Sequence, residues 1–198
     1  SEKDRKTVQS ILNDVRKNGD SAVKKYEQKF NGRKTSRLRV SVPDFKEERY
    51  EQSLGNMGTI LRRMEDALLW NLSGSKKRGA GFTSVKTGFF GNIPLETEKR
   101  FVPIPSVGCY IPGGQARYPS SVVMSVVPAK LAGVKRIVVV SPPGRDGKID
   151  PLTIAAARNC GATEIYKVGG AQAIAALSYG TKSIPKVDKI VGPGGKFV

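Results

Sequence analysis

The chain of 198 residues is long enough for one sizeable domain, or for one domain with a smaller lobe. Its hydrophobic content of 38% is typical of a packed globular protein, and no apolar run reaches the roughly 20 residues of a membrane-spanning helix. It has no histidine and only two cysteines, Cys109 and Cys160. These counts argue against a disulfide framework and against metal or histidine-assisted catalysis within this chain, and they favour a cytoplasmic location.

The net charge of +17 is spread over both halves of the chain. Such a charge attracts nucleic acid, anionic cofactors or an acidic partner surface. The densest basic run, Lys76-Lys77-Arg78, follows Gly74 and is expected to be a solvated loop. No aromatic residues are interleaved with the charges, which makes nucleic acid an unlikely partner and leaves a basic nucleic-acid-binding protein as an alternative only.

The first 92 residues predict a mainly helical lobe. Apolar residues at helical spacing indicate a first helix that stops near Asn18-Gly19 and a second that Asp20 or Ser21 caps. The inward side chains expected from this spacing are Val8, Ile11, Leu12, Val15, Ala22, Val23, Tyr26 and Phe30.

Three further segments complete the predicted lobe. Residues 38–42 alternate in polarity, which predicts a short half-exposed strand. A long helix follows, with an apolar stripe from Tyr50 to Leu68 that is expected to dock on the body of the protein or on a second subunit. Residues 73–105 are rich in glycine and proline and are interpreted as mostly loop, with at most a small strand at Val85–Phe89.

The second half predicts strands that alternate with helices. Asp150-Pro151 is a typical helix start, and Gly161 is a typical stop. The expected strands are 107–111, 136–140, 165–168 and 189–191, and the expected helices are 120–131, 151–160 and 171–179. This alternation is typical of βαβ units and a parallel sheet.

Each predicted strand ends in a loop rich in glycine or proline. In a parallel α/β sheet the ligand crevice lies beyond the carboxyl ends of the strands. The helix from Ala171 would point its free N–H groups at that crevice, where a pyrophosphate could bind, with Gln172 in its first turn. The G-x-G-x-x-G fingerprint is absent, so the pattern alone also fits glycines such as Gly169 and Gly170 that only make tight turns.

Five sequence blocks resemble histidinol dehydrogenase in order and spacing. They begin at Val107, Tyr118, Pro128, Val168 and Ile184, and the resemblance is weaker before Val107. It implies an α/β fold in which a helical N-terminal lobe (1–92) precedes an incomplete Rossmann-like parallel sheet (93–198), a fold similar to aldehyde dehydrogenases. It also implies a cytoplasmic homodimer that oxidises L-histidinol through histidinal to L-histidine, in histidine biosynthesis, with NAD and zinc.

The resemblance also implies three cofactor-binding residues. The NAD-contacting tyrosine and glutamine of the family match Tyr110 and Gln172, and the family's asparagine contact falls on Gly195. The family's zinc ligands and catalytic Glu-His pair match no position of this chain. The chain is therefore expected to be the NAD-binding half of such an enzyme, either as a truncation or as a shortened homologue. It is expected to have no catalytic or metal-binding residues and to be inactive alone.

Two alternatives concern single features of the sequence. A shortened homologue could act as an interaction module through the stripe from Tyr50 to Leu68. Asp188 follows Gly170 at nearly the spacing of a ribose-binding carboxylate, although it begins a predicted strand instead of ending one. Cys109 and Cys160 are expected to be reduced, buried core residues.

Overall fold

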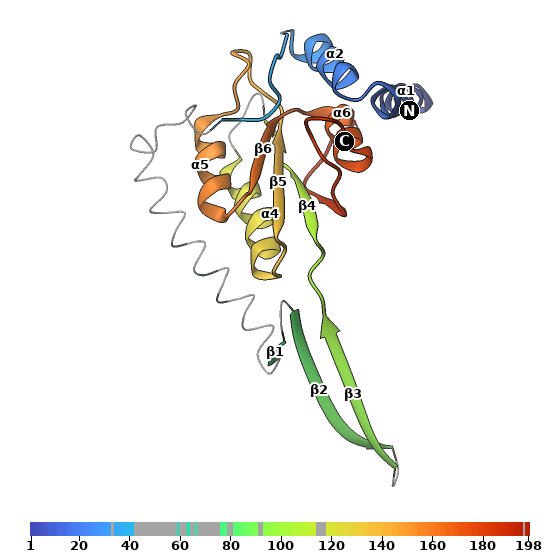
Figure 1. The fold of residues 1–198 in the computed structure, drawn as a ribbon, viewed down its shortest axis with the longest axis vertical. Helices are drawn as coiled ribbons and strands as arrows, with labels where there is room; N and C mark the ends of the chain where they lie inside the picture. The colour runs from blue at the N-terminus through green and yellow to red at the C-terminus, as the bar shows by residue number, and fades with distance from the viewer. Residues whose placement is uncertain are drawn as a thin grey trace.

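The computed structural model describes residues 1–32, 34–41, 59, 63, 66, 76–78, 81–90, 93–113, 118–195 and 197–198. The predicted helix with the stripe from Tyr50 to Leu68 lies largely outside these residues. The described elements form a body around one parallel sheet, from which a long antiparallel arm projects (Figure 1).

The parallel sheet contains four strands. They are β4 (Ser106–Tyr110), β5 (Arg136–Ser141), β6 (Glu164–Lys167) and β7 (Lys189–Val191). The connecting helices are α4 (Pro119–Leu131), α5 (Pro151–Cys160) and α6 (Gly170–Tyr179). All neighbouring strands are parallel and their order is β6-β5-β4-β7, so the predicted βαβ units and parallel sheet are confirmed. This order reverses between β4 and β7, as in the first half of a Rossmann-type sheet.

Local sequence signals set the boundaries of α5 as predicted. The side chain of Asp150 accepts hydrogen bonds from the backbone N–H groups of Leu152 and Thr153, and Pro151 occupies the first turn. Gly161 ends the helix in the left-handed conformation, with φ of 101°. The apolar, β-branched strand β5 that precedes this helix is buried over Ile137–Ser141, as expected for a strand covered on both faces.

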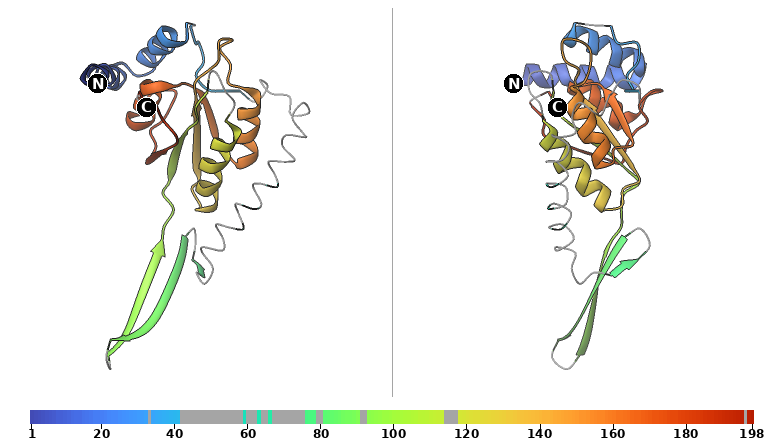
Figure 2. Two further views of the ribbon diagram at one scale, coloured as in Figure 1. Left: turned by 180° about the vertical axis from the view of Figure 1, so that it is seen from behind. Right: turned by 90° about the vertical axis from the view of Figure 1, so that its left-hand side faces the viewer.

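Helices cover both faces of the sheet and enclose two hydrophobic clusters. Helices α4 and α5 lie on one face, over a cluster that includes Cys109, Val139 and Ile154. On the other face α6 packs with α1 (Glu2–Asn18) and α2 (Asp20–Asn31), as the two views of Figure 2 show. The predicted helical N-terminal segment therefore shares a core with the sheet.

The two N-terminal helices follow the predicted pattern with two corrections. Gly19 is the N-cap of α2 and provides no side-chain hydrogen bond to the helix. The Asp20 carboxylate instead accepts hydrogen bonds from the Ser183 backbone N–H (3.2 Å) and hydroxyl (2.6 Å). The predicted cap by Asp20 or Ser21 is therefore wrong. Phe30 is 53% exposed and not inward, whereas Glu27 is fully buried.

Of the strand predicted at residues 38–42, the described residues 38–41 include a short pairing with β6. The backbone N–H of Val40 donates a hydrogen bond to the carbonyl of Ile165, and the N–H of Lys167 donates one to the carbonyl of Leu38. Between them Arg39 and Tyr166 form an isolated antiparallel bridge. This segment covers the β6 edge of the sheet, which would otherwise be open to pairing with another chain.

The projecting arm corrects the prediction for residues 73–105. Strands β2 (Gly81–Phe90) and β3 (Ile93–Phe101) pair antiparallel from Phe90 opposite Ile93 to Phe82 opposite Phe101. The basic run that was expected to be a solvated loop forms β1 (Lys76–Arg78) on the outer side of β2. The predicted domain boundary falls between β2 and β3, and the division into two domains stays a prediction.

Candidate functional site

The predicted tyrosine and glutamine come together at the carboxyl edge of the sheet. Tyr110 is the last residue of β4, and α6 begins at Gly170 after β6. The Gly170 N–H donates a hydrogen bond of 3.2 Å to the Tyr110 hydroxyl oxygen, so the tyrosine contacts the first turn of α6. This edge is where parallel α/β sheets bind ligands.

Gln172 lies in that first turn with its side chain almost completely buried, at 2% exposed. Its Nε2 donates a hydrogen bond of 2.8 Å to Oε1 of Glu27. Its Oε1 is buried and has no hydrogen-bond partner among the residues that the structure describes. An unsatisfied buried acceptor costs about 1–3 kcal/mol of stability, and a hydrogen-bond donor from a ligand would remove that cost.

Glu27 is the residue of this cluster that sequence reasoning missed. Its Oε1 also accepts the Gly169 N–H at 3.0 Å, and its Oε2 accepts Nδ2 of Asn31 at 2.6 Å. Burial raises the pKa of the Glu27 carboxyl above its ordinary value, and these hydrogen bonds oppose the rise. The available signal was an acidic residue one helical turn after the inward Val23, on the buried face of α2.

Burial also governs the electrostatics of Tyr110. The side chain is 7% exposed, and burial raises the pKa of its hydroxyl above the ordinary value, assisted by the charge of Glu27. The hydrogen bond from Gly170 acts in the opposite direction. The phenol therefore stays protonated at neutral pH and keeps a hydrogen to donate.

Gly195, the third predicted cofactor residue, lies in the loop after β7. Its carbonyl accepts the Val198 N–H at 2.9 Å, and no atom lies within 4 Å of the position that a Cβ would occupy. Among the described residues it hydrogen-bonds to neither Tyr110 nor Gln172. The structure thus connects two of the three predicted residues through Gly170 and leaves open space around the third.

The glycine before α6 serves the packing of the turn. A Cβ on Gly169 would lie 2.4 Å from the Cβ of Pro142, in the loop after β5. This contact supports the interpretation that part of the glycine pattern makes close turns, and it accounts for Gly169 without any ligand. Tyr110 and Gln172, and not Gly169, are therefore the residues that indicate a ligand site here.

Asp188 lies at the opposite end of the sheet. It stands just before β7, where its carboxylate accepts a hydrogen bond of 2.5 Å from the hydroxyl of Ser106, the first residue of β4. The Ser106 hydroxyl oxygen in turn accepts the Asp188 N–H at 3.1 Å. This reciprocal pair joins the amino ends of two strands and supports a structural role for Asp188 in place of ribose binding.

Both cysteines are core residues, as predicted. Cys109 and Cys160 are free thiols, and each is at most 1% exposed. Burial raises the pKa of the Cys109 thiol to about 12 and that of Cys160 to about 11. Because the thiolate is the reactive form, neither is suited to act as a nucleophile at neutral pH.

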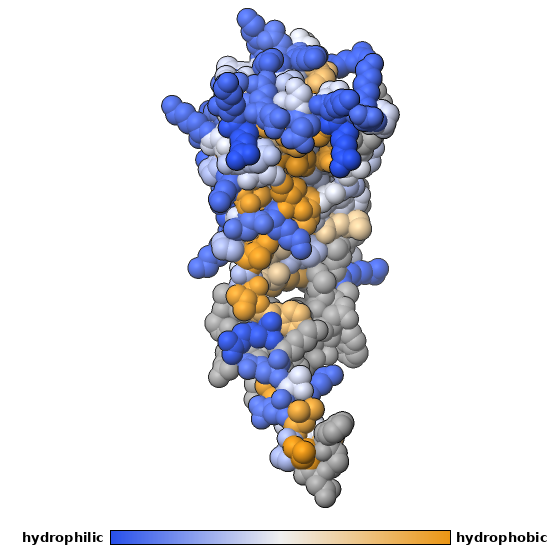
Figure 3. All heavy atoms as spheres, turned by 90° about the vertical axis from the view of Figure 1, so that its right-hand side faces the viewer, coloured by the Kyte–Doolittle hydropathy of each residue, from blue (hydrophilic) through white to orange (hydrophobic). Residues whose placement is uncertain are grey.

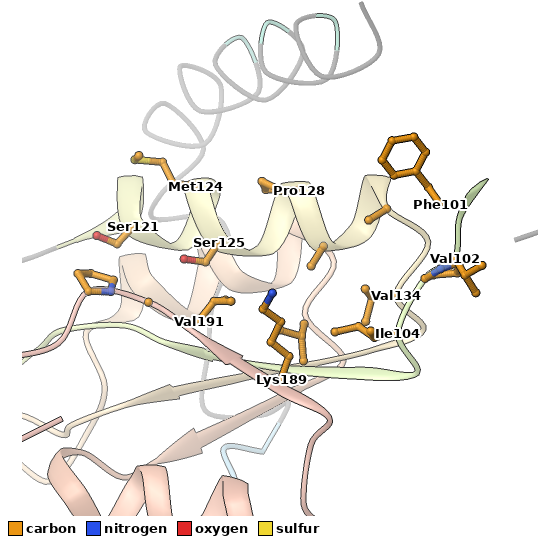
Figure 4. A pocket seen from close by; sticks show the side chains of 16 residues that line it. Phe101, Val102, Ile104, Ser121, Met124, Ser125, Pro128, Val134, Lys189 and Val191 are labelled. Atoms are coloured by element: carbon orange, nitrogen blue, oxygen red, sulfur yellow. The ribbon is translucent and has the colours of Figure 1, made fainter. Parts of the chain in front are cut away.

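A groove of about 860 Å³ lies on the α4 face of the sheet. In it Ser125 of α4 stands opposite Lys189 and Val191 of β7 (Figure 4). Most other lining residues are apolar, and they include Val107, Met124, Pro128 and Val134. Tyr110 and Gln172 do not line it, and its apolar walls suit hydrocarbon better than a pyrophosphate.

Among the residues that the structure describes, no group of three or more His, Cys, Asp or Glu side chains gathers in a way that could hold a metal ion. No described helix is both long and apolar enough to span a membrane.

The order β6-β5-β4-β7, with Tyr110 and Gln172 at the carboxyl edge, defines a Rossmann-like α/β protein. The family model for histidinol dehydrogenase matches residues 1–198. The chain is 45% identical to histidinol dehydrogenase of Bacillus cereus over 195 residues and 40% identical to that of Methanosarcina barkeri over 197 residues. It therefore belongs to the histidinol dehydrogenase family, whose members are oxidoreductases.

Each alignment covers 98% of this chain but only 43% of the relative. The chain thus spans less than half the length of these relatives, in their N-terminal portion. A crystal structure of histidinol dehydrogenase from Elizabethkingia anophelis superposes with a TM-score of 0.74 at 29% identity, again over 98% of this chain and 43% of that one. The predicted resemblance and fold class are both confirmed.

Proposed function

We propose that this chain is the NAD-binding portion of a histidinol dehydrogenase. The observation that carries the proposal is the hydrogen bond from the Gly170 N–H to the Tyr110 hydroxyl, because it brings Tyr110 of β4 against the turn that carries Gln172. That turn lies at the carboxyl edge of a parallel sheet, beside the place where the strand order reverses.

The chemistry of these groups fits a dinucleotide. The unsatisfied Oε1 of Gln172 can accept a hydrogen bond from a ribose hydroxyl or an amino group of NAD. Because the atom is buried, a ligand reaches it only if neighbouring groups shift slightly. The N-terminus of α6 places a positive partial charge near the pyrophosphate, and NAD, when bound, supplies the acceptor for hydride.

The activity of the whole family enzyme is a further part of the proposal. Oxidation of L-histidinol through histidinal to L-histidine, with zinc, would need the catalytic and metal-binding residues of the family. These residues match no position of this chain. The acidic and thiol side chains of the described residues do not fit a zinc site, so we assign no step through zinc to them. We propose that the chain alone binds NAD but does not oxidise histidinol, and we keep the cytoplasmic location as part of the proposal.

Calorimetric titration of the chain with NAD tests the proposal. We expect saturable binding that weakens about tenfold in Gln172→Ala, because one ligand hydrogen bond is lost in a buried site. Asp188→Ala is the matched control, since the Asp188 carboxylate lies at the opposite end of the sheet. The NAD affinity of this variant should stay within about twofold of the wild-type value. Absence of binding by the wild-type chain would contradict the proposal.

The arm supports a second proposal, that the chain associates with another copy of itself. Both faces of the β2–β3 ribbon expose apolar side chains, including Phe89 (78%) and Ile93 (66%). In Figure 3 hydrophobic residues form a broken stripe from the body to the arm. A two-stranded ribbon is marginal in water by itself, so a partner that covers it would stabilise it.

Sedimentation velocity tests this association. We expect the wild-type chain to form a dimer, and we expect Phe89→Ser combined with Ile93→Ser to shift it towards monomer, because contact area on the arm is lost. Phe30→Ser is the matched control, since Phe30 is 53% exposed on α2, at the opposite end of the molecule from the arm (Figure 1). A wild-type chain that stays monomeric, or a dimer insensitive to the arm substitutions, would contradict this proposal.

A further inference from the structure

A single carboxylate connects the N-terminal helices to the candidate cofactor turn. Glu27 belongs to α2, yet its Oε1 accepts hydrogen bonds from the Gly169 N–H and the Gln172 amide, 142 and 145 residues further along the chain. All three groups are buried or lie in the buried turn. The contact therefore ties a helix outside the sheet to the first turn of α6.

The chemistry of a carboxylate fixes the direction of the Gln172 amide. An ionised carboxylate only accepts hydrogen bonds, so the group of Gln172 that faces Glu27 has to be the Nε2 donor. The amide oxygen then faces away from Glu27, and it is the atom without a partner among the described residues. Glu27 thus determines that Gln172 offers an acceptor and not a donor.

Stability alone does not account for a carboxylate at this position. Glu27 is fully buried, and none of the ion pairs between described residues includes it. Desolvation of an ionised carboxylate is costly, and an isosteric neutral amide at this position would avoid that cost. A buried carboxylate with a raised pKa and no ion pair to a described residue is typical of a functional site.

We propose that Glu27 is a positioning residue of the cofactor site, which orients Gln172 so that its amide oxygen accepts a hydrogen bond from a donor group of the dinucleotide. This role rests on the proposed NAD site. Through the same carboxylate oxygen Glu27 holds the Gly169 N–H and so fixes the start of α6. The N-terminal helices thereby contribute to cofactor binding without contacting the cofactor.

The neighbours of Glu27 come from three elements. Asn31 on α2 donates a hydrogen bond to Oε2 of Glu27, and Gln172 on α6 donates one to Oε1. The negative charge of Glu27 also helps to raise the pKa of the Tyr110 hydroxyl on β4. Of these neighbours only Tyr110 titrates, far above neutral pH. A change of NAD affinity as pH falls through the raised pKa of Glu27 would therefore report on this carboxyl and not on its neighbours.

Asp20 provides a control that separates positioning from simple docking of α2. Asp20 is at the start of α2 and its carboxylate accepts hydrogen bonds from Ser183, beyond the end of α6. Asp20 thus anchors α2 to the loop after α6, whereas Glu27 anchors it to the first turn of α6, and of the two only Glu27 contacts the cofactor turn. Loss of Asp20 should loosen the docking of α2 without changing the orientation of Gln172.

The experiment compares NAD affinity by calorimetry and urea unfolding midpoints for the wild-type chain, Glu27→Ala, Glu27→Gln and Asp20→Ala. We expect Glu27→Ala to weaken NAD binding about tenfold and Glu27→Gln about threefold, because a neutral amide holds Gln172 less firmly and in either orientation. We expect the midpoint of Glu27→Gln at pH 7 to equal or exceed that of the wild-type chain. Asp20→Ala should lower the midpoint and leave NAD affinity within about twofold.

The pH dependence of NAD binding adds a measurement that a purely structural role would not change. Wild-type affinity should fall as pH is lowered through the raised pKa of Glu27, because the protonated carboxyl can donate to Gln172 and turn its amide. Glu27→Gln should show a flat profile over the same range.

The outcomes distinguish this role from the cofactor site itself. If the wild-type chain does not bind NAD, the site is wrong and this role falls with it. If the wild-type chain binds but both folded Glu27 variants bind equally well, the site stands and the positioning role is overturned. Equal losses of NAD affinity in Glu27→Ala and Asp20→Ala would also overturn the positioning role. If Glu27→Ala does not fold, the NAD affinity of Glu27→Gln decides the result.

Discussion

Gly192 and Tyr110 approach so closely that a side chain at position 192 is impossible in this arrangement. A Cβ on Gly192 would lie 2.1 Å from the carbonyl oxygen of Tyr110, and the glycine has a φ of 139°. The contact joins the loop after β7 to the end of β4, where the strand order reverses. Gly192 therefore lets the loop after β7 pack against the end of β4.

Gly192→Ala should destabilise the chain by about 2–4 kcal/mol, because it combines a strained backbone with a clash against main-chain atoms. Urea unfolding followed by circular dichroism measures the change. Gly195→Ala in the same loop is the control and should stay within about 0.5 kcal/mol, since the space around Gly195 is open. Similar unfolding free energies for the two variants would contradict the packing described at the loop junction.

Gly195→Asn should tighten NAD binding several-fold. The family resemblance implies an asparagine at this position, and no atom lies within 4 Å of the added Cβ, so we expect the new amide to form one more hydrogen bond to the ligand. Calorimetry on Gly195→Asn and on Gly195→Ala, which lacks the amide, measures the gain. An asparagine variant that binds no more tightly than the alanine variant would exclude this residue from the cofactor site.

The sequence predicted the sheet well because its signals are local. The β-branched run from Arg136, the cap at Asp150 and the stop at Gly161 each act within a few residues, and their elements begin and end within one residue of the prediction. Tyr110 and Gln172 were predicted from the family resemblance, and the structure joins them through Gly170.

The missed features depend on contacts distant in sequence. Glu27 looks like an ordinary helix residue until Gly169 and Gln172 fold against it. Asp20 caps no helix because Ser183 binds its carboxylate. The arm was missed because glycines in residues 73–105 were interpreted as loop signals, whereas the pairing of β2 with β3 overrides that local preference.

An ion pair between β5 and β6 should make stability depend on pH. Arg136 donates to both carboxylate oxygens of Glu164, at 2.7 and 3.1 Å, and also to the carbonyls of Lys186 and Pro185 before β7. Hydrogen bonds from Arg136 lower the pKa of Glu164 below its ordinary value of 4.5. Folding therefore gains stability above pH 4.5 and loses it as pH falls through the lowered pKa.

Arg136→Gln should cost about 1–3 kcal/mol at pH 7, and the difference from the wild-type chain should shrink as Glu164 becomes protonated. Urea unfolding at pH 7 and at a series of lower pH values, down to the lowest at which the wild-type chain stays folded, measures the difference. A cost that is the same at all of these pH values would show that the ion pair contributes no pH-dependent stability.

The two thiols should be inert in the folded chain. Because Cys109 and Cys160 are buried and burial raises the pKa of both thiols, neither forms thiolate near pH 8. We expect no reaction with Ellman's reagent under native conditions and complete reaction of both thiols in denaturant. Rapid labelling of either thiol in the native chain would contradict the packing of the core around β4 and α5.

Titration of the ¹⁵N-labelled chain with NAD, followed by amide chemical shifts, tests the location of the cofactor most directly. We predict that the largest changes fall on Gly170 and Gln172, with further changes in the loops that follow Tyr110 and Val191. Amides near Ser106 and Asp188, at the opposite end of the sheet, should stay unchanged. Changes confined to that opposite end or to the groove between α4 and β7, or no changes at all, would contradict the cofactor site at the carboxyl edge.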